Sequence, residues 1–334
     1  MPSVTILVTG GAGYIGSHCV RRLAEESIST VVLDNLSSGR RDAVPAGVPF
    51  VQCDAGDTDT VSAVIRKHGV SAVMHFAGHI VAPESIDDPL RYYANNVCVS
   101  RNLVETCLRE GVRHFIFSSS AAVYGNATLS PVPESAPLLP ISPYGTTKLI
   151  TEWMLRDVAA SPGGAEFRYA SLRYFNVAGA RLDGTAGQAT PNATHLIKVA
   201  AEAACGKRKS VSIFGTDYPT RDGTCIRDYI HVEDLANAHI VALRHLQAGG
   251  RSETYNCGYG KGYTVREVLS AMQEATGIKL NLADAPRRAG DPAQLIADSS
   301  RLLRELRWQP RLDDLRVICE SAYRWERSLQ GRRQ

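Results

Sequence analysis

A tyrosine and a lysine four residues apart are the side chains in this sequence best suited to proton chemistry. Tyr144 and Lys148 would share one face of a helix, because positions i and i+4 are neighbours there. A free tyrosine has a pKa of about 10 and is a poor base near pH 7. A fixed ammonium beside the ring favours the phenolate, so the pair predicts proton removal from a substrate hydroxyl. The same spacing also occurs where a half-buried tyrosine merely lies beside a solvated lysine.

A glycine-rich segment near the N-terminus favours the chemical interpretation. Residues 4–9 are an apolar, partly β-branched run that predicts a buried strand, and Gly10, Gly13 and Gly16 follow it. Glycines at these places permit a tight turn, close approach of a pyrophosphate and packing of the next helix on the strand. That helix, which begins near Tyr14, would direct its free N–H groups at the phosphates.

An acidic residue follows the second predicted strand. Residues 30–33 are apolar and β-branched, and Asp34 comes directly after them. A carboxylate at this place bonds the adenosine ribose hydroxyls and repels a 2′-phosphate, which favours NAD over NADP. Arg40 and Arg41 lie nearby and weaken that preference. The order of strand, glycines, helix, strand and acid predicts a dinucleotide site.

The alternation of strands and helices predicts an α/β fold, a Rossmann-type doubly wound parallel sheet with a smaller, irregular C-terminal lobe. We expect residues 1–178, with a return segment at about 226–250, to form the NAD-binding domain. Residues 179–225 and 251–334 would form the lobe that binds the substrate. Further strands are predicted at 50–53, 72–76, 114–117 and 169–173, and long helices at 90–110 and 144–160.

Composition excludes several classes of protein. The 334 residues are 44% hydrophobic, which is typical of a globular chain, and a net charge of +3 gives no reason to expect nucleic acid. No long apolar run predicts a membrane span, and the early first strand leaves no room for a signal peptide. The eight cysteines lack zinc spacing, so we expect no metal site and reduced, buried thiols in a cytoplasmic protein.

Besides the glycine and Tyr/Lys motifs, the chain contains Asp-Tyr-Pro-Thr at 217–220 and Arg-Asp-Tyr-Ile-His at 227–231. These belong to a set of short stretches spread over nearly the whole chain, at residues 9–16, 75–78, 92–96, 117–125, 142–145, 172–176, 217–220, 227–232 and 285–291. Together the stretches resemble the UDP-glucose 4-epimerases, a family of the extended short-chain dehydrogenase/reductase superfamily. The glycine and Tyr/Lys motifs are common to the superfamily, whereas the stretches at 217–220 and 227–231 are more specific to these epimerases.

The resemblance implies an isomerase that interconverts UDP-galactose and UDP-glucose by transient oxidation at sugar C4, with tightly bound NAD. Tyr144 would remove the proton from the 4-hydroxyl as hydride passes to the nicotinamide. Lys148 would lower the pKa of that tyrosine and hold the nicotinamide ribose. Ser120 would hydrogen-bond the reacting oxygen and Tyr144, although it could instead cap the end of a strand. The family also implies a homodimer that pairs the helices at 90–110 and 144–160.

The resemblance also implies which residues surround the cofactor. The expected cofactor-binding residues are Gly10, Gly13, Tyr14, Ile15, Gly16, Asp34, Asn35, Leu36, Ser37, Ser38, Gly39, Asp54, Ala55, Phe76, Ala77, Gly78, Asn95, Ser118, Tyr144, Lys148, Tyr174 and Phe175.

The implied substrate site needs positive charge for a diphosphate and a flat pocket for uracil. Arg227 and Arg288 would clamp the diphosphate, because guanidinium binds phosphate oxygens bidentately, with Asp291 on a ribose hydroxyl. Phe214 could also be core packing, and Arg227 could pair with Asp228 or Asp234. The expected substrate-binding residues are Ser120, Tyr144, Asn176, His195, Leu196, Ser212, Ile213, Phe214, Arg227, Arg288, Asp291 and Leu295.

Some positions depart from the family pattern. Ile80 stands where some members have a cofactor-contacting lysine, and His195 where some have asparagine. Leu295 stands where a large aromatic or a small residue governs acceptance of N-acetylated sugars. The alternatives are an epimerase of another UDP-sugar, either a UDP-N-acetylhexosamine or a UDP-pentose, and a catalytically idle NAD-binding regulatory protein. A sugar-nucleotide 4,6-dehydratase would need an acidic pair where Ala121 and Ala122 stand.

Overall fold

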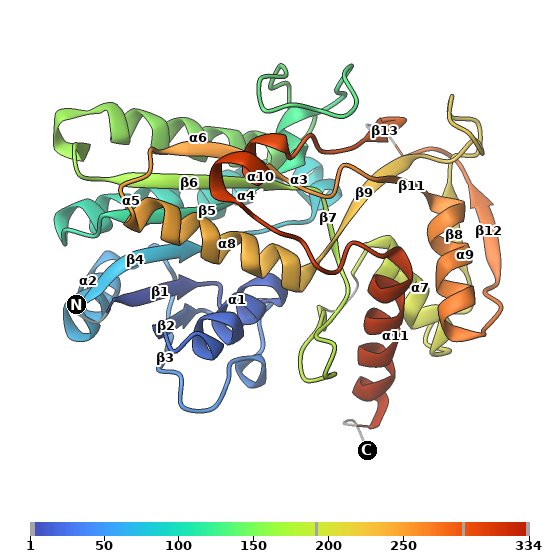
Figure 1. The fold of residues 1–334 in the computed structure, drawn as a ribbon, viewed down its shortest axis with the longest axis horizontal. Coiled ribbons are helices and arrows are strands. Elements are labelled where there is room, and N and C mark those ends of the chain that lie inside the picture. Colours follow the sequence, from blue (N-terminus) through green and yellow to red (C-terminus); the bar gives the residue numbers. More distant parts are fainter. Residues whose placement is uncertain (1–3, 191–192, 289–290, 332–334) are drawn as a thin grey trace.

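A seven-stranded, all-parallel sheet organises the larger part of the molecule (Figure 1). The computed structural model describes residues 4–190, 193–288 and 291–331; residues 289 and 290 of the motif at 285–291 lie outside the described residues. The strand order β10-β6-β5-β4-β1-β2-β3 is that of a doubly wound sheet, so the predicted fold class is confirmed. The strands are β1 (Thr5–Thr9), β2 (Ser29–Asp34), β3 (Phe50–Gln52), β4 (Val70–His75), β5 (His114–Ser120), β6 (Arg168–Tyr174) and β10 (Glu253–Cys257).

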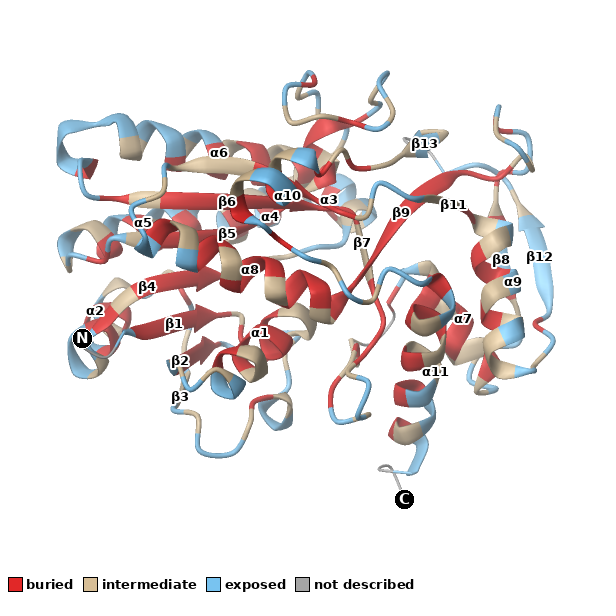
Figure 2. Cartoon of the chain, in the orientation of Figure 1, coloured by how far each residue is buried: buried red, intermediate tan, exposed pale blue. Residues whose placement is uncertain are grey.

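Helices cover both faces of this sheet, and the strands between them are buried (Figure 2). Two apolar cores result, because alternate side chains of each strand point to opposite faces. One face is covered by α1 (Tyr14–Glu25), α8 (Val232–Gln247) and α10 (Ser300–Leu306), and the other by α2 (Thr58–His68), α5 (Val99–Arg109) and α6 (Pro143–Ala160). Short 3-10 helices are η1 (Arg41–Ala43), η3 (Ala121–Tyr124) and η4 (Pro162–Gly164).

The helix predicted over 90–110 is not one regular α-helix. It consists of α4 (Pro89–Tyr92), the π-helical segment η2 (Tyr93–Cys98) and α5, and the short α3 (Ala82–Asp87) precedes it. π-helical turns are rare and often occur at functional sites. Here the wide turn contains Asn95 and Asn96, whose side chains turn back toward the loop after β4.

A second lobe lies at the carboxyl ends of the large sheet's strands (Figure 1). Its small sheets contain β7 (Asn176–Ala178), β9 (Ile226–His231), β11 (Gly262–Thr264) and β13 (Gln294–Leu295), and separately β8 (Val211–Phe214) with β12 (Leu282–Ala285). Helices α7 (Leu196–Ala204), α9 (Val265–Thr276) and α11 (Leu315–Gly331) pack around a third core. Within the described ranges, no helix combines the length and apolar character that a membrane crossing needs.

The predicted domain boundaries and the strand pairing differ for three strands. The strand β10 was expected in the second lobe, but it pairs in parallel with β6 and forms the edge of the large sheet. The strands β7 and β9 were expected in the cofactor domain, but they pair with each other, and β9 also pairs with β11 and β13. Sequence order alone does not assign a strand to a sheet, because the chain crosses between the lobes. The division into two domains otherwise stays a prediction.

Candidate active site

The loop between β1 and α1 forms a cradle of the kind expected for a pyrophosphate. Gly10 has a φ of +71°, and a Cβ there would lie 2.5 Å from the Ala77 nitrogen, so the position requires glycine. A Cβ on Gly13 would approach the Gly10 carbonyl oxygen at 3.2 Å, in space that a bound group could use instead. Gly13 is also the N-cap of α1 and has no side chain to bind the first amides. The cradle therefore fits a phosphate held by backbone N–H donors.

Asp34 ends β2, as predicted, and its carboxylate is held by backbone amides. One oxygen accepts a hydrogen bond from the Ala12 amide at 2.9 Å, and the other accepts from the Leu36 amide at 2.8 Å. A carboxylate oxygen has two acceptor sites, so each oxygen keeps capacity for a ribose hydroxyl. The Asp34 carboxylate therefore fits its expected role of binding the adenosine ribose.

The two arginines near Asp34 are engaged with other groups. Arg40 forms an ion pair with Asp42, and the Arg41 guanidinium lies 4.5 Å from the centre of the Phe50 ring. Neither arrangement directs a free cation at a 2′-phosphate. These arginines therefore weaken the predicted preference for NAD over NADP less than the sequence suggested.

Most of the other predicted cofactor residues lie on loops at the carboxyl ends of the strands, and the remainder lie in α1, η2, β5 and β6. The Asn35 side chain donates to Asp54 at 3.1 Å and joins the loops after β2 and β3. The His79 amide, after β4, donates to the side chains of Asn95 at 3.1 Å and Asn96 at 2.8 Å. The rest are Leu36, Ser37, Ser38 and Gly39 after β2, Ala55 after β3, Phe76, Ala77 and Gly78 after β4, Tyr14, Ile15 and Gly16 in α1, Ser118 in β5, and Tyr174 and Phe175 at the end of β6.

The predicted base, lysine and serine come together where β5 meets α6. Helix α6 begins at Pro143, with Ser142 as its N-cap, and carries Tyr144 and Lys148 one turn apart. The Lys148 ammonium lies 5.9 Å from the centre of the Tyr144 ring and donates to the Ser118 carbonyl at 2.8 Å. Ser120 ends β5 beside them. Its hydroxyl also accepts from the Ala122 amide at 3.1 Å, so the alternative role as a strand-end cap is present too.

Burial governs the protonation of this pair. It raises the pKa of Tyr144, and a hydrogen bond with Ser120 opposes that rise only in part. It also lowers the pKa of Lys148 to about 8, while the charge of Glu152 acts to raise it. The pKa of Tyr144 is therefore raised where the sequence predicted a lowered one, because loss of solvent around the phenol outweighs the Ser120 hydrogen bond.

Sequence reasoning missed a contact that joins the cofactor loop to α6. The Asn96 amide donates to the His79 carbonyl at 3.0 Å and to the Thr147 hydroxyl at 3.1 Å. Thr147 in turn donates to the Tyr144 carbonyl at 2.8 Å. Asn96 and Thr147 are 51 residues apart, and a local spacing does not predict such a contact. Asn96 thereby links the loop after β4 to the helix that carries the base.

Sequence reasoning also missed a buried histidine beneath the site. His75, at the end of β4, contacts the hydroxyls of Thr9 at 2.7 Å and Ser100 at 2.9 Å. Burial, together with the charge of Lys148, lowers its pKa to about 3. His75 is therefore neutral in ordinary buffers and is a structural link between β1, β4 and α5.

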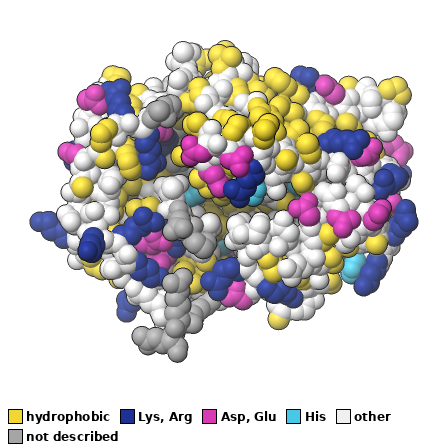
Figure 3. All heavy atoms as spheres, turned by 180° about the vertical axis from the view of Figure 1, so that it is seen from behind, with side chains coloured by type: hydrophobic (Ala, Val, Ile, Leu, Met, Phe, Trp, Pro, Cys, Tyr) yellow, Lys and Arg dark blue, Asp and Glu magenta, His cyan; other side chains and the backbone are white. Residues whose placement is uncertain are grey.

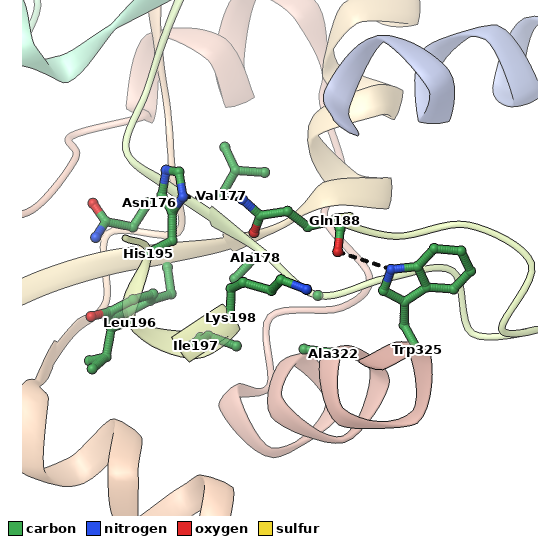
Figure 4. Close-up of a pocket in the computed structure, with 12 residues that line it drawn as sticks. Asn176, Val177, Ala178, Gln188, His195, Leu196, Ile197, Lys198, Ala322 and Trp325 are labelled. Atoms are coloured by element: carbon green, nitrogen blue, oxygen red, sulfur yellow. Dashed lines mark hydrogen bonds between the residues drawn. The ribbon is translucent and has the colours of Figure 1, made fainter. Parts of the chain in front are cut away.

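Three predicted substrate residues, Asn176, His195 and Leu196, line a pocket beside β7 (Figure 4). Gln188 also lines it and contacts the His195 ring at 3.1 Å, while its own carbonyl accepts from Trp325 at 3.0 Å. Burial lowers the pKa of His195, so its imidazole is neutral and able to donate or accept a hydrogen bond. Figure 4 shows α11 closing one side of this pocket.

The predicted diphosphate and uracil residues form a second group around β9. Arg227 pairs with Asp291 at 3.1 Å, not with Asp228 or Asp234, and the Arg288 guanidinium lies 3.8 Å from the centre of the Phe214 ring. Phe214 is half-buried, so core packing does not account for it alone.

Two further residues predicted to bind the substrate lie on β8, and one is exposed while the other is buried. Ser212 is exposed, whereas the Ile213 side chain is fully buried in the third core. Ile213 could therefore reach a ligand only through its backbone. Leu295 lies opposite Arg227 in the pairing of β13 with β9, and it packs on a cluster that includes Ala121 and Phe175. That packing brings it near the end of β5.

A glycine cradle on a doubly wound sheet, with a serine, tyrosine and lysine beside it, defines a Rossmann-type enzyme of the short-chain dehydrogenase/reductase class. A sequence profile of the NAD dependent epimerase/dehydratase family matches residues 6–258. The chain belongs to this family and, within it, to the UDP-glucose 4-epimerases.

Similar proteins support that assignment. The UDP-glucose 4-epimerase of Azospirillum brasilense is 54% identical over 98% of this chain and 93% of the relative. The crystal structure of UDP-glucose-4-epimerase from Stenotrophomonas maltophila, with bound NAD and formylated UDP-arabinopyranose, is 39% identical, with a TM-score of 0.95 over 98% of this chain and 99% of that one. The UDP-Glc/GlcNAc 4-epimerase of Campylobacter jejuni is 48% identical, with a TM-score of 0.85 over 97% and 99%.

Proposed function

We propose that this chain is a UDP-glucose 4-epimerase that interconverts UDP-galactose and UDP-glucose with bound NAD. The observation that carries the proposal is the convergence of Ser120, Tyr144 and Lys148 beside a phosphate cradle at the end of the large sheet. Full-length similarity to UDP-glucose 4-epimerases supports the reaction, and a relative solved with NAD supports the cofactor.

The proposed mechanism assigns a separate task to each side chain. NAD, when bound, supplies a reversible hydride acceptor, and Gly10, Gly13 and Asp34 would hold it. Tyr144 takes the proton of the sugar 4-hydroxyl at its phenol oxygen and later returns it. Ser120 orients that hydroxyl, and the Lys148 ammonium stabilises the phenolate.

The residues proposed to bind the UDP part of the substrate hold the nucleotide in position. Arg227 and Arg288 bind the diphosphate, with Asp291 on a ribose hydroxyl and Phe214 against the uracil. Because these contacts lie far from C4, they can hold the nucleotide while the sugar turns over and presents its other face. The reaction has no net redox change, so the site would need no exchange of cofactor between turnovers.

The direct test is incubation of the purified protein with UDP-galactose, without added NAD, and measurement of UDP-glucose. We expect conversion in both directions to one equilibrium ratio. Conversion of UDP-N-acetylglucosamine or a UDP-pentose in its place would favour the epimerase of another UDP-sugar. Bound NAD with no conversion of any of these substrates would favour the idle regulatory protein.

Asp34 is expected to make the protein select NAD over NADP. A 2′-phosphate would meet a carboxylate already fixed by two backbone amides, so it would be repelled. Denatured protein should release NAD or NADH. Asp34→Asn should reduce the difference in affinity between NAD and NADP, measured by calorimetry on cofactor-free protein. Equal binding of both cofactors by the unchanged protein would show that Asp34 does not discriminate.

Leu295 is expected to limit the size of the sugar. Its bulk opposes an N-acetyl group by overpacking, which costs roughly 1–3 kcal/mol, or about 5- to 150-fold in rate. Leu295→Ser should therefore raise kcat/KM for UDP-N-acetylglucosamine relative to UDP-glucose. Leu282→Ser, on the exposed strand β12, is the matched control. An unchanged ratio in Leu295→Ser would mean that this residue does not line the sugar pocket.

We also propose that the protein is a cytoplasmic homodimer. All eight cysteines are free, which suits a reducing compartment, although Cys98 is exposed and Cys53 and Cys205 are half-buried, not buried as expected. In Figure 3, hydrophobic side chains gather in the upper part of the molecule, and α6 lies in the upper part in Figure 1. Ile86 of α3, Leu90 of α4 and Trp153 of α6 are exposed, and α6 packs against α3 and α4.

Light scattering at micromolar concentration is expected to give twice the mass of the chain. Not every apolar residue of the two helices expected at the interface suits it: Leu103, Val104 and Leu155 are buried against the sheet, and Met154 packs beside them. Trp153→Asp should instead weaken the dimer, because it places a charge on the exposed apolar surface. Leu303→Asp is the control, because the Leu303 side chain is exposed on α10. A monomeric unchanged protein would refute the proposal.

A further inference from the structure

A buried ion pair lies directly behind the proposed catalytic residues. Glu152 follows Lys148 by one turn on α6, and its partner Arg173 is in β6; each side chain is 5% exposed. The Arg173 Nε donates to the two carboxylate oxygens at 2.9 and 3.2 Å, and Nη2 also donates to this carboxylate. Forked pairing of this kind keeps a carboxylate ionised in a dry interior.

The pair also joins the elements that carry Ser120 and Lys148. Ser119, the residue before Ser120 in β5, donates its hydroxyl to the Glu152 carboxylate. Arg173 donates at 2.9 Å to the hydroxyl of Tyr124, in the short helix η3 that follows Ser120. One carboxylate thus connects α6, β5 and β6 immediately beneath the site.

The groups that face Lys148 show why this carboxylate matters. Burial disfavours the ammonium form, and Glu152, one turn along α6, opposes that effect. His75, on β4, is buried and neutral, and Tyr144 is itself a phenol whose pKa burial raises. The other titratable or charged groups around this network include Tyr124 in η3, Glu134 beside it, and Tyr169, Arg173 and Tyr174 in β6.

We propose that Glu152, held by Arg173 and Ser119 one turn along α6 from Lys148, is a positioning residue that keeps the Lys148 ammonium charged beside Tyr144. The proposal rests on the proposed epimerase reaction, in which the ammonium stabilises the tyrosinate. Glu152 acts through the lysine and touches neither substrate nor cofactor. With a neutral side chain at this position, burial would be unopposed and the ammonium would lose its proton at lower pH.

The test is the titration of Lys148 in Glu152→Gln, which removes the charge and keeps the shape. The ¹³Cε signal of labelled lysine, assigned with Lys148→Arg, should titrate near pH 8 in the unchanged holoenzyme. In Glu152→Gln the midpoint should fall by about one pH unit, and the alkaline limb of kcat should move with it. Glu152→Asp, which keeps the charge but shortens the side chain, should stay near the original midpoint.

Asp234→Asn is the matched control. This buried carboxylate is bound by the amides of Arg311 and Leu312 and by the Tyr259 hydroxyl, so its loss should leave the Lys148 midpoint in place. An unchanged or higher midpoint in folded Glu152→Gln, or an equal fall in Glu152→Asp, would overturn the proposal.

The unchanged protein provides a test even if Glu152→Gln does not fold. A Lys148 midpoint below about pH 6 in the unchanged holoenzyme would show that the carboxylate does not sustain the ammonium. The NMR midpoint does not depend on turnover. Failure of this proposal can therefore be distinguished from failure of the proposed epimerase reaction.

Discussion

Replacing Tyr144 by Phe is expected to slow epimerisation by about 10²- to 10⁴-fold, the usual contribution of a general acid–base group. The substitution removes one hydroxyl and keeps the ring that lies 5.9 Å from the Lys148 ammonium. NAD content and thermal unfolding should therefore be close to those of the unchanged protein. The measurement is kcat for UDP-galactose, with NAD quantified after denaturation.

Tyr255→Phe is the matched control for Tyr144→Phe. This tyrosine is fully buried in β10, and its hydroxyl lies 3.5 Å from a Glu305 oxygen. Its loss should change stability slightly and turnover little. Near-normal kcat in folded Tyr144→Phe would show that another group takes the proton. A large loss in both variants would point to a general effect of removing a buried hydroxyl.

The parts of the site that follow from local spacing could be predicted from the sequence. Gly10, Gly13 and Asp34 belong to one strand–helix–strand unit, and its geometry places them together whatever the rest of the chain does. Tyr144 and Lys148 are likewise one turn apart on a single helix. Each prediction needed only the periodicity of one element and its position relative to the next.

The parts that depend on distant pairing could not be predicted. The alternative ion-pair partners expected for Arg227 were Asp228 and Asp234, but its partner in the structure is Asp291, 64 residues away. Glu152 reads as an ordinary polar position in a helix, and only the packing of α6 against β6 reveals its buried partner. The sequence carries no local mark of such a contact, because the partner comes from a separate element.

The protonation of the site also required the fold. The spacing of Tyr144 and Lys148 predicts a lowered tyrosine pKa, but it says nothing about burial. In the structure, burial raises the pKa of the phenol and lowers that of the lysine. The sign of a pKa shift thus depends on the depth of both groups, which a pairwise pattern does not contain.

Arg173→Met is expected to reduce the free energy of unfolding by about 3–5 kcal/mol, the effect of leaving one charge of a buried pair without its partner. Methionine fills similar space but donates no hydrogen bond, so the Glu152 carboxylate would keep the Ser119 hydroxyl and lose the guanidinium. The Tyr124 hydroxyl would lose a donor as well. Urea unfolding of cofactor-free protein, followed by circular dichroism, measures the change.

The double variant Glu152→Leu with Arg173→Met separates lost charge pairing from lost packing. Apolar replacement of a whole buried pair is often neutral, because neither charge then remains in the dry interior. We therefore expect the double variant to recover much of the stability that Arg173→Met loses. Arg113→Met, which breaks the exposed Arg113–Glu166 pair, should change stability little. A double variant less stable than Arg173→Met would show that the side chains matter for their shape and not for their charges.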